Sequence, residues 1–381
     1  PDFSKNANVA ATAPAFFSAW DIHAYYGESY IVQGVSFNIH EGEILALLGR
    51  NGAGKTSTLR AIARLDSPQL RGGEVWLDHK PLHKMSSFEA SQQGVALVPE
   101  DRRIISGLTV EENLQLAQIA PPIGWSLERI YELFPRLGER RKQEGVTLSG
   151  GEQQMLAIAR ALARDIKLLL LDEPLGALDL KLRRQMQIEL KRIQVEVGIT
   201  FVHVTHDQEE AMTMADTIAV MNEGKIEQLG APQDIYDTPH TAFAANFLGQ
   251  SNMFPGDIVE SGDTITVKAF DQVFTLPKAK SATSSDKIIL GIRPEKLALH
   301  RGDDEVPAGR NTLTGRITDA SFVGVSTQYL VVAPWGQEVI AFEQNLSAGS
   351  RPRVGEEVTL SWDPRHTFGL DGNDDLNAGL D

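Results

Sequence analysis

No cysteine occurs among the 381 residues, which excludes disulfides, zinc sites with thiolate ligands and cysteine nucleophiles. Long apolar runs are also lacking. The longest, such as residues 168–171, have the length of a strand, whereas a membrane-spanning helix needs roughly 18 residues. Residues 1–15 are small and polar and do not resemble a secretion signal, so we expect residues 1–18 to form a flexible tail. These absences direct attention to noncovalent chemistry by polar side chains and backbone amides.

Positive charge is in deficit. The 36 lysines and arginines face 51 aspartates and glutamates, for a net charge of -15. An acidic surface repels nucleic-acid backbones and anionic lipid, so we expect no nucleic-acid partner. A phosphate-bearing ligand needs a local exception built from backbone amides, a lysine and a metal ion.

The length of the chain predicts two domains. In the first part strands alternate with helices, which indicates a parallel sheet covered on both faces. We expect a helical region over about residues 100–165 and, from glycines and a proline, a loop over residues 67–73. The main strands are expected at 31–39, 44–48, 95–98, 167–171, 200–205 and 217–221, and the main helices at 57–65, 180–197 and 208–215.

The pattern changes after about residue 247, where helical spacing nearly vanishes. Short alternating segments follow, at 264–269, 287–290, 314–317, 328–332, 338–342 and 357–362. Regular short strands with glycine turns predict a small all-β barrel or sandwich over residues 246–370. Residues 371–381 are acidic and contain glycine, so we expect a disordered tail.

The segment Gly49–Thr56 fits the pattern G-x-x-x-x-G-K-[ST]. Glycines let the backbone wrap around phosphates without a Cβ clash, and the amides of such a nest, with the start of the following helix, attract anions. Lys55 can reach the β and γ phosphates, and Thr56 can bind Mg²⁺. A strand before the segment and a helix after it favour this interpretation over a chance glycine turn.

A buried strand ends in Asp172 and Glu173. We expect Asp172 to bind Mg²⁺ and Glu173 to act as a general base on the attacking water. Two acids at a strand end are often only a solvated turn. The phosphate loop decides for the functional interpretation, because parallel sheets collect their sites at the carboxyl ends of strands.

Two further segments carry candidate residues. His206 follows the strand at 200–205 and can hydrogen bond a γ phosphate or the attacking water, whereas His203 lies within the strand and is interpreted as structural. Ser149-Gly150-Gly151 precedes a helix and is either a second anion-binding device or an ordinary helix N-cap.

Taken in order, these motifs resemble the ATP-binding subunit of ABC transporters over about residues 20–245. The resemblance implies an α/β P-loop NTPase domain over residues 19–245 with a helical subdomain at about 100–165. The segments that carry it are Tyr26-Gly27, Gly49–Thr56, Leu148–Gln154, Leu171–Pro174, Gly176–Asp179 and Thr205-His206-Asp207.

The resemblance also implies roles. Tyr26 would stack on adenine, Lys55, Glu173 and His206 would serve catalysis, and Ser149 and Gly151 would bind the ATP held by a second copy of the chain. Asp179 would communicate across this dimer. The implied nucleotide-binding set is Tyr26, Gly49, Arg50, Asn51, Gly52, Ala53, Gly54, Lys55, Thr56, Ser57, Ser149, Gly150, Gly151, Gln153 and Asp179.

Mg²⁺ would accompany ATP, held by Thr56, Asp172 and Glu100. Glu100 stands where the family commonly has a glutamine that senses Mg²⁺ and the membrane subunit, so its charge departs from the family pattern. The implied partners are transmembrane permease subunits and, indirectly, a substrate-binding protein, which places the chain at the cytoplasmic face of the cell membrane.

The two halves resemble different importers. Residues 47–56, 98–103 and 150–160 resemble the subunits of branched-chain amino acid importers. Residues 175–179, 203–211, 230–249 and 291–295 resemble those for polyamines, sugars and ferric iron, which carry a C-terminal β-domain of the TOBE type. The chain therefore looks like a mosaic, natural or engineered, that changes character between about residues 158 and 174. Residues 247–252 favour spermidine and putrescine as cargo, with sugars, ferric iron and branched-chain amino acids as alternatives.

Two other classes of function stay open. One is a soluble ABC ATPase of repair or translation, although such proteins usually carry two cassettes or a coiled-coil insert. The other makes the β-domain a ligand-sensing module with the ATPase as its switch, against the simpler interpretation of a structural dimer contact.

Overall fold

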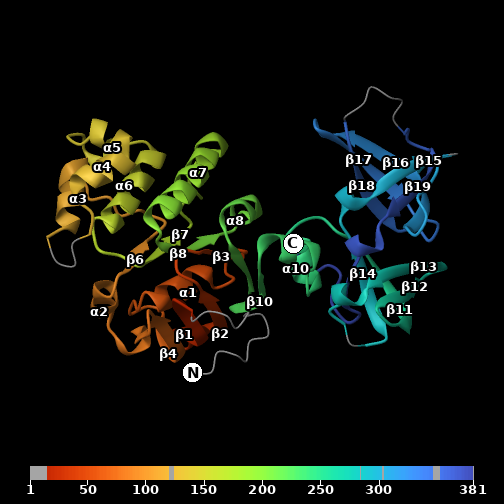
Figure 1. The fold of residues 1–381 in the computed structure, drawn as a ribbon, viewed down its shortest axis with the longest axis horizontal. Coiled ribbons are helices and arrows are strands. Elements are labelled where there is room, and N and C mark those ends of the chain that lie inside the picture. Colours follow the sequence, from red (N-terminus) through yellow and green to blue (C-terminus); the bar gives the residue numbers. More distant parts are fainter. Residues whose placement is uncertain (1–14, 120–123, 284, 303, 346–351, 381) are drawn as a thin grey trace. The chain divides into compact units, whose positions relative to one another are not determined.

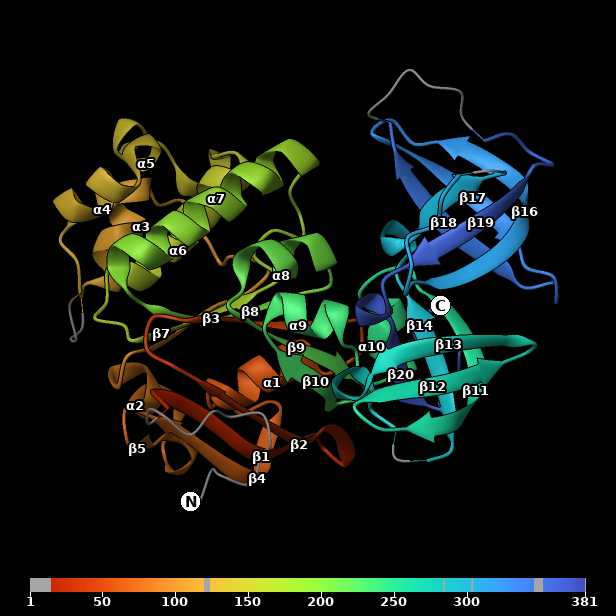
Figure 2. The same ribbon diagram turned by 45° about the vertical axis from the view of Figure 1, so that its right-hand side comes forward.

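The computed structural model describes residues 15–119, 124–283, 285–302, 304–345 and 352–380 (Figures 1 and 2). The chain forms two compact units, of which the first ends at Pro232 and the second begins at Gln233. The sequence predicts the boundary between the units at 245/246, about 13 residues after the observed one. The difference arises because the two short helices that come before residue 248 belong to the second unit.

The first unit is built around a six-stranded sheet in the order β10-β9-β3-β8-β7-β6. All neighbours are parallel except β10, which pairs antiparallel with β9. Helix α1 (Lys55–Ile62) lies on one face, and α7 (Leu180–Val197) and α8 (Gln208–Met214) lie on the other (Figure 2). The strands are β3 (Ile44–Gly49), β6 (Val95–Val98), β7 (Leu168–Asp172), β8 (Thr200–Thr205), β9 (Thr217–Asn222) and β10 (Lys225–Gly230).

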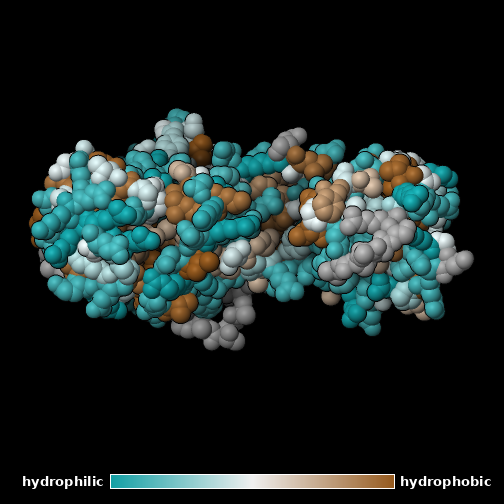
Figure 3. Space-filling model, turned by 90° about the horizontal axis from the view of Figure 1, so that it is seen from above, coloured by the Kyte–Doolittle hydropathy of each residue, from teal (hydrophilic) through white to brown (hydrophobic). Residues whose placement is uncertain are grey.

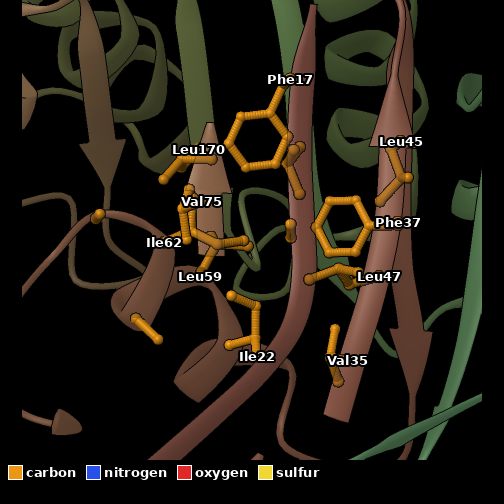
Figure 4. Close-up of a cluster of buried hydrophobic side chains, with 14 of the residues drawn as sticks. Phe17, Ile22, Val35, Phe37, Leu45, Leu47, Leu59, Ile62, Val75 and Leu170 are labelled. Atoms are coloured by element: carbon orange, nitrogen blue, oxygen red, sulfur yellow. The ribbon is translucent and has the colours of Figure 1, made fainter. Parts of the chain in front are cut away.

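An antiparallel sheet, β2-β1-β4-β5, forms a second layer over α1. Its strands are β1 (Phe17–Tyr26), β2 (Ser29–Ile39), β4 (Gln69–Leu77) and β5 (Lys80–Pro81). Phe17 and Phe37 pack with Leu47 and Leu59 between the layers, as Figure 4 shows. This continuous apolar core fixes the start of α1 against the central sheet.

Strand β4 corrects the expected loop over residues 67–73. The pairing of β4 with β1 shifts register between Trp20 and His23, where β1 bulges. A Cβ on Gly73 would lie 2.1 Å from Asp21 O, and Gly73 has a φ of +86°. The glycine that suggests a loop is therefore required by a close strand contact, which local sequence does not reveal.

The expected helical subdomain is present. It contains α3 (Val110–Ala117), α4 (Leu127–Leu133), α5 (Pro135–Glu139) and α6 (Gly150–Leu162), and α2 (Ser87–Gln92) precedes β6. Thr109 and Ser149 close capping boxes with Glu112 and Glu152 at the starts of α3 and α6. The reciprocal side-chain and backbone bonds of a capping box define where each helix begins.

The second unit contains two five-stranded antiparallel sheets, β13-β12-β11-β14-β20 and β15-β19-β16-β17-β18. Phe254 on β11, Phe274 on β13 and Trp362 on β19 stack in a core that both sheets share, which confirms the small all-β domain. The elements are α9 (Pro232–Asp237), α10 (Ala242–Phe247), β11 (Asn252–Ser261), β12 (Thr264–Ala269), β13 (Gln272–Pro277), β14 (Lys287–Ile292), β15 (Ala298–Arg301), β16 (Asn311–Phe322), β17 (Ser326–Val332), β18 (Glu338–Gln344), β19 (Glu357–Trp362) and β20 (Phe368–Asp371).

Both expected tails need correction. Phe17 and Ser18 belong to β1, and Phe17 is fully buried, while residues 1–14 of the expected tail lie outside the described residues. At the other end, Asp371 ends β20 and residues 372–380 form turns rather than a disordered segment, and residue 381 lies outside the described part. Asn246 Nδ2 donates to Leu376 O and Ala378 O, at 2.9 and 2.8 Å. Hydrogen bonds from α10 therefore order an acidic segment whose composition suggests disorder.

Arg293 ties the helices of the second unit to its sheets. The side chain is 1% exposed, and its guanidinium stacks 4.1 Å from the Tyr236 ring. Its N–H groups donate to Tyr236 O at 3.0 Å, Ala245 O at 2.7 Å and Gly249 O at 2.9 Å. One buried cation thus serves carbonyl groups of α9, α10 and the following turn.

We expect Arg293→Met to lower the free energy of unfolding of the second unit by about 3 kcal/mol, because several buried carbonyls lose their donor. Differential scanning calorimetry of the full chain checks this as a downward shift of one transition. The matched control is Arg365→Met, since Arg365 is 79% exposed and pairs with Asp363 at the surface; it leaves that transition in place. Equal shifts for both variants would contradict the assigned role of Arg293.

Candidate functional site

The candidate site forms where three parallel strands end. β8 lies between β3 and β7, and the pairing brings Leu48 opposite Thr205 and Asp172 opposite Val204. The segments that follow these strands therefore start at one edge of the sheet: the Gly49–Thr56 loop, Glu173 and His206. The sheet brings the phosphate loop together with Glu173 and His206, which lie more than a hundred residues further along the chain, as the motifs predict.

The Gly49–Thr56 loop needs its glycines. A Cβ on Gly49 would lie 2.4 Å from Met221 O, and Gly54 has a φ of +95°. Gly54 is also the N-cap of α1 and offers no side-chain cap. Because the first amides of a helix have no acceptor within it, they are free to bind an anion that the loop encloses.

Lys55 is held over this loop. Its side chain is buried, and Nζ donates to Gly49 O and Arg50 O, both at 2.9 Å. Burial lowers the pKa of Lys55, while the nearby carboxylates Glu173 and Asp172 act in the opposite direction. The ammonium group and the amides together form a cationic cradle that fits the phosphates of a nucleotide.

Thr56 and Asp172 form the candidate metal-binding pair. Thr56 Oγ1 donates to Asp172 Oδ1 at 2.6 Å. Burial raises the pKa of Asp172, and the hydrogen bond from Thr56 opposes that shift. Oxygens of this kind suit Mg²⁺, which is usually held by one or two protein ligands together with phosphates and water.

The third expected metal ligand follows β6, which pairs in parallel with β7 and brings Val98 opposite Leu171. Glu100 is exposed in the turn that follows β6, so its role as a ligand stays a prediction. Among the described residues, no group of three or more histidines and carboxylates could hold a metal ion by itself. A metal ion at Thr56 and Asp172 would therefore depend on oxygens from a bound phosphate.

Glu173 faces both Lys55 and His206. Its Oε1 lies 3.9 Å from Lys55 Nζ, and its Oε2 lies 3.1 Å from His206 Nδ1. The backbone of Glu173 is left-handed, with a φ of +44°, a strained conformation for a residue other than glycine. A carboxylate held this way at the end of β7 can accept a proton from a water molecule placed over the loop.

The remaining candidate residues divide between two places. Ser57 Oγ lies 3.5 Å from Tyr26 OH, so Tyr26 reaches the start of α1. Ser149 instead caps α6, where a Cβ on Gly150 would meet Leu178 and one on Gly151 would meet Leu182. Asp179 caps α7 through the amide of Leu182 at 3.0 Å. Ser149, Gly150, Gly151 and Asp179 thus lie beside the start of α7, and Ser149 is an N-cap whatever else it binds.

Two neighbours complete the description of expected residues. Gln153 Nε2 donates to Val146 O and Leu148 O, both at 3.0 Å, and so closes the turn before α6. His203 is 1% exposed within β8, and burial lowers its pKa to about 4. It is therefore uncharged at neutral pH, as the structural interpretation requires.

Several polar residues surround His206 that were not among the candidates predicted from the sequence. Arg183 Nη1 pairs with Asp207 Oδ2 at 2.7 Å, and Thr205 Oγ1 donates to the buried Glu210 at 2.9 Å. The three-residue spacing of Asp207 and Glu210 is a helix N-cap signal that could have identified this turn. Arg183 carries no such local signal, because its partner lies on another helix.

Comparison with known proteins agrees with this geometry. A family model described as ABC transporter matches residues 32–176, and one described as TOBE domain matches residues 290–370. A spermidine/putrescine import ATP-binding protein PotA from Thermobifida fusca is 40% identical over 347 residues, which cover 90% of this chain and 88% of that protein. A protein of the same name from Rubrobacter xylanophilus is 38% identical and covers 91% of each chain. These alignments run through both halves of the chain.

A solved structure adds the fold of the first unit. The dimeric, post-hydrolysis ATP-binding cassette MJ0796 bound to ADP and Pi is 29% identical, with a TM-score of 0.50. It matches 57% of this chain and 98% of that one. The ADP and Pi bound to that cassette are the products of ATP hydrolysis.

In the part of the chain that the structure describes, no helix is both long and apolar enough to cross a bilayer. On the face shown in Figure 3, apolar patches alternate with polar side chains. The phosphate loop, the strand-end carboxylates, the two family matches and the relatives agree. The chain belongs to the ABC transporter family, as an ATP-hydrolysing subunit that carries a TOBE domain.

Proposed function

We propose that this chain drives the import of spermidine or putrescine, as one of two copies bound to permease subunits at the cytoplasmic face of a membrane. The observation that supports hydrolysis is the meeting of Lys55, Glu173 and His206 at one sheet edge. The cargo is supported by the names of relatives that are 32–40% identical over most of their length.

The residues of this edge would divide the chemistry. Bound MgATP supplies the γ-phosphoryl group that is transferred to water. Lys55 and the loop amides bind its phosphates, and Thr56 and Asp172 hold the ion. Glu173 orients the attacking water and accepts its proton at a carboxylate oxygen, while His206 keeps Glu173 in place through Nδ1. Tyr26 would stack on the adenine.

A second copy of the chain would complete each site. Ser149 caps α6, Gln153 closes the turn before it, and Gly150 and Gly151 lie beside Leu178 and Leu182 near the start of α7. A helix N-terminus attracts phosphate, and the similar cassette MJ0796 is dimeric. We infer that these residues and Asp179 meet the ATP bound to the partner copy.

A groove beside Glu100 is the proposed contact for the permease. It has a volume of about 420 Å³ and lies between the central sheet and the helical subdomain. Among the described residues its lining holds no acidic side chain but five arginines, which are Arg60, Arg102, Arg103, Arg160 and Arg164. Charge complementarity favours a partner segment that carries carboxylates.

Glu173→Gln tests the hydrolytic role. Glutamine keeps the shape of the side chain but cannot accept the proton, so we expect kcat for ATP to fall at least about 100-fold while ATP binding is retained. Light scattering with ATP should then show an accumulated dimer. Glu209→Gln makes the same chemical change at an exposed position of α8 and serves as the control. Unchanged hydrolysis in Glu173→Gln would rule out the assigned base.

Uptake by cells tests the cargo. Deletion of the corresponding gene should lower the uptake of labelled spermidine and putrescine, and the wild-type gene, but not the Glu173→Gln variant, should restore it. Labelled sugar, ferric iron and branched-chain amino acids are measured in the same cells. A loss confined to one of those cargoes would replace the polyamine assignment and leave the ATPase assignment intact.

A further inference from the structure

The turn that carries His206 is closed by a ring of hydrogen bonds. Thr205 Oγ1 accepts from Asp207 N at 3.0 Å and donates to Glu210 Oε2 at 2.9 Å. Asp207 Oδ1 in turn accepts from Glu210 N at 3.1 Å. The ring fixes the backbone on both sides of His206, so it sets the point from which the imidazole reaches Glu173.

A carboxyl group such as that of Glu210 is energetically unfavourable at this buried position. It is 2% exposed, and burial raises its pKa to about 7. Among the described residues its second oxygen, Oε1, has no hydrogen-bond partner and lies 3.8 Å from the ring of the buried, uncharged His203. A buried carboxyl that is only half satisfied adds little to stability, and its hydrogen bond serves the turn.

Arg183 connects this turn to a second segment of the site. Its Nη1 lies 2.7 Å from Asp207 Oδ2, and its Nη2 donates to Leu178 O at 3.3 Å. Leu178 directly precedes Asp179, the N-cap of α7. A single guanidinium thus holds both the residue after His206 and the residue before Asp179, with two donors in the fixed geometry of a fork.

We propose that Arg183 is a positioning residue for hydrolysis: it sets His206 against Glu173 and makes that position depend on the Leu178–Asp179 segment. This rests on the proposed function, in which Asp179 faces the second copy. A displacement of Leu178 moves the guanidinium, which moves Asp207 and, through the closed turn, the imidazole. Shifts of about 1 Å in a catalytic constellation change rates up to about 100-fold.

A neighbouring ion pair between the same two helices provides a comparison with a purely structural contact. Arg184 on α7 lies 3.3 Å from Glu209 on α8, and both side chains are 61% exposed. It joins the same two helices, through Arg184 one residue after Arg183 and Glu209 two residues after Asp207, and takes no part in the hydrogen bonds given above for Leu178 and the His206 turn. Arg184→Met is therefore a matched control for Arg183→Met.

Asp207→Asn provides a second variant that keeps the helix start. Asparagine caps a helix as well as aspartate does, so the hydrogen bond to Glu210 N is retained while the charge opposite Arg183 is lost. This variant therefore separates the effect of losing the Arg183–Asp207 pair from any effect on the stability of α8. Arg183→Lys keeps the charge but cannot form both bonds of the fork, and it should restore only part of the rate.

The test is steady-state hydrolysis of ATP by the full chain, with melting temperature and ATP affinity measured in parallel. We expect Arg183→Met and Asp207→Asn each to lower kcat about 10- to 100-fold, with KM and ATP affinity within about twofold. The double variant should be no slower than the slower single variant, because each single variant already removes the ion pair between Arg183 and Asp207. Melting temperatures should match that of Arg184→Met.

Four results would overturn or confirm the proposal. It is overturned if Arg183→Met retains the kcat of Arg184→Met, if the effects of the two single variants multiply in the double variant, or if ATP affinity falls together with kcat. A kcat defect shared by the pair, at unchanged KM and melting temperature, supports it. Loss of hydrolysis in the wild-type chain itself would instead contradict the proposed function, so the two failures are distinguishable.

Discussion

The parallel pairing of β3, β8 and β7 is the constraint on which the rest of the first unit depends. Parallel strands bring their carboxyl ends to one edge, and these three are buried along their whole length. The apolar run of each strand ends abruptly in a glycine loop, a carboxylate or a histidine. Polar chemistry is thus placed at the rim of a core whose packing leaves little freedom of position.

The site tolerates groups that are unfavourable elsewhere in a fold. Lys55 and Asp172 are almost fully buried, and burial shifts the pKa of each toward its neutral form. Glu173 has a strained backbone. Lys55 is held by hydrogen bonds that it donates to the loop carbonyls, and Asp172 by the one that it accepts from Thr56. A bound, charged ligand that offers further hydrogen-bond partners would lower the energetic cost of burying these groups. Such groups are therefore tolerated at a nucleotide site.

The second unit solves a different problem. Two small sheets share one aromatic core, and the short helices before them must be joined to it. Arg293 does this with a buried cation that serves carbonyls from three segments. The same side chain also stacks on Tyr236, so charge, hydrogen bonding and packing act at one position.

Sequence alone determined the motifs whose partners are local: the phosphate loop, the strand-end carboxylates, the order of strands and helices, and the change to an all-β unit. Tertiary structure decided what depends on distant neighbours. Gly73 lies in β4 against the bulge of β1 at Asp21 rather than in a loop, the residues after 371 are ordered by Asn246, and Arg183 meets Asp207 across two helices. Periodicity and spacing report which residues a segment buries, but the partner of a long side chain is set only when separate elements pack together.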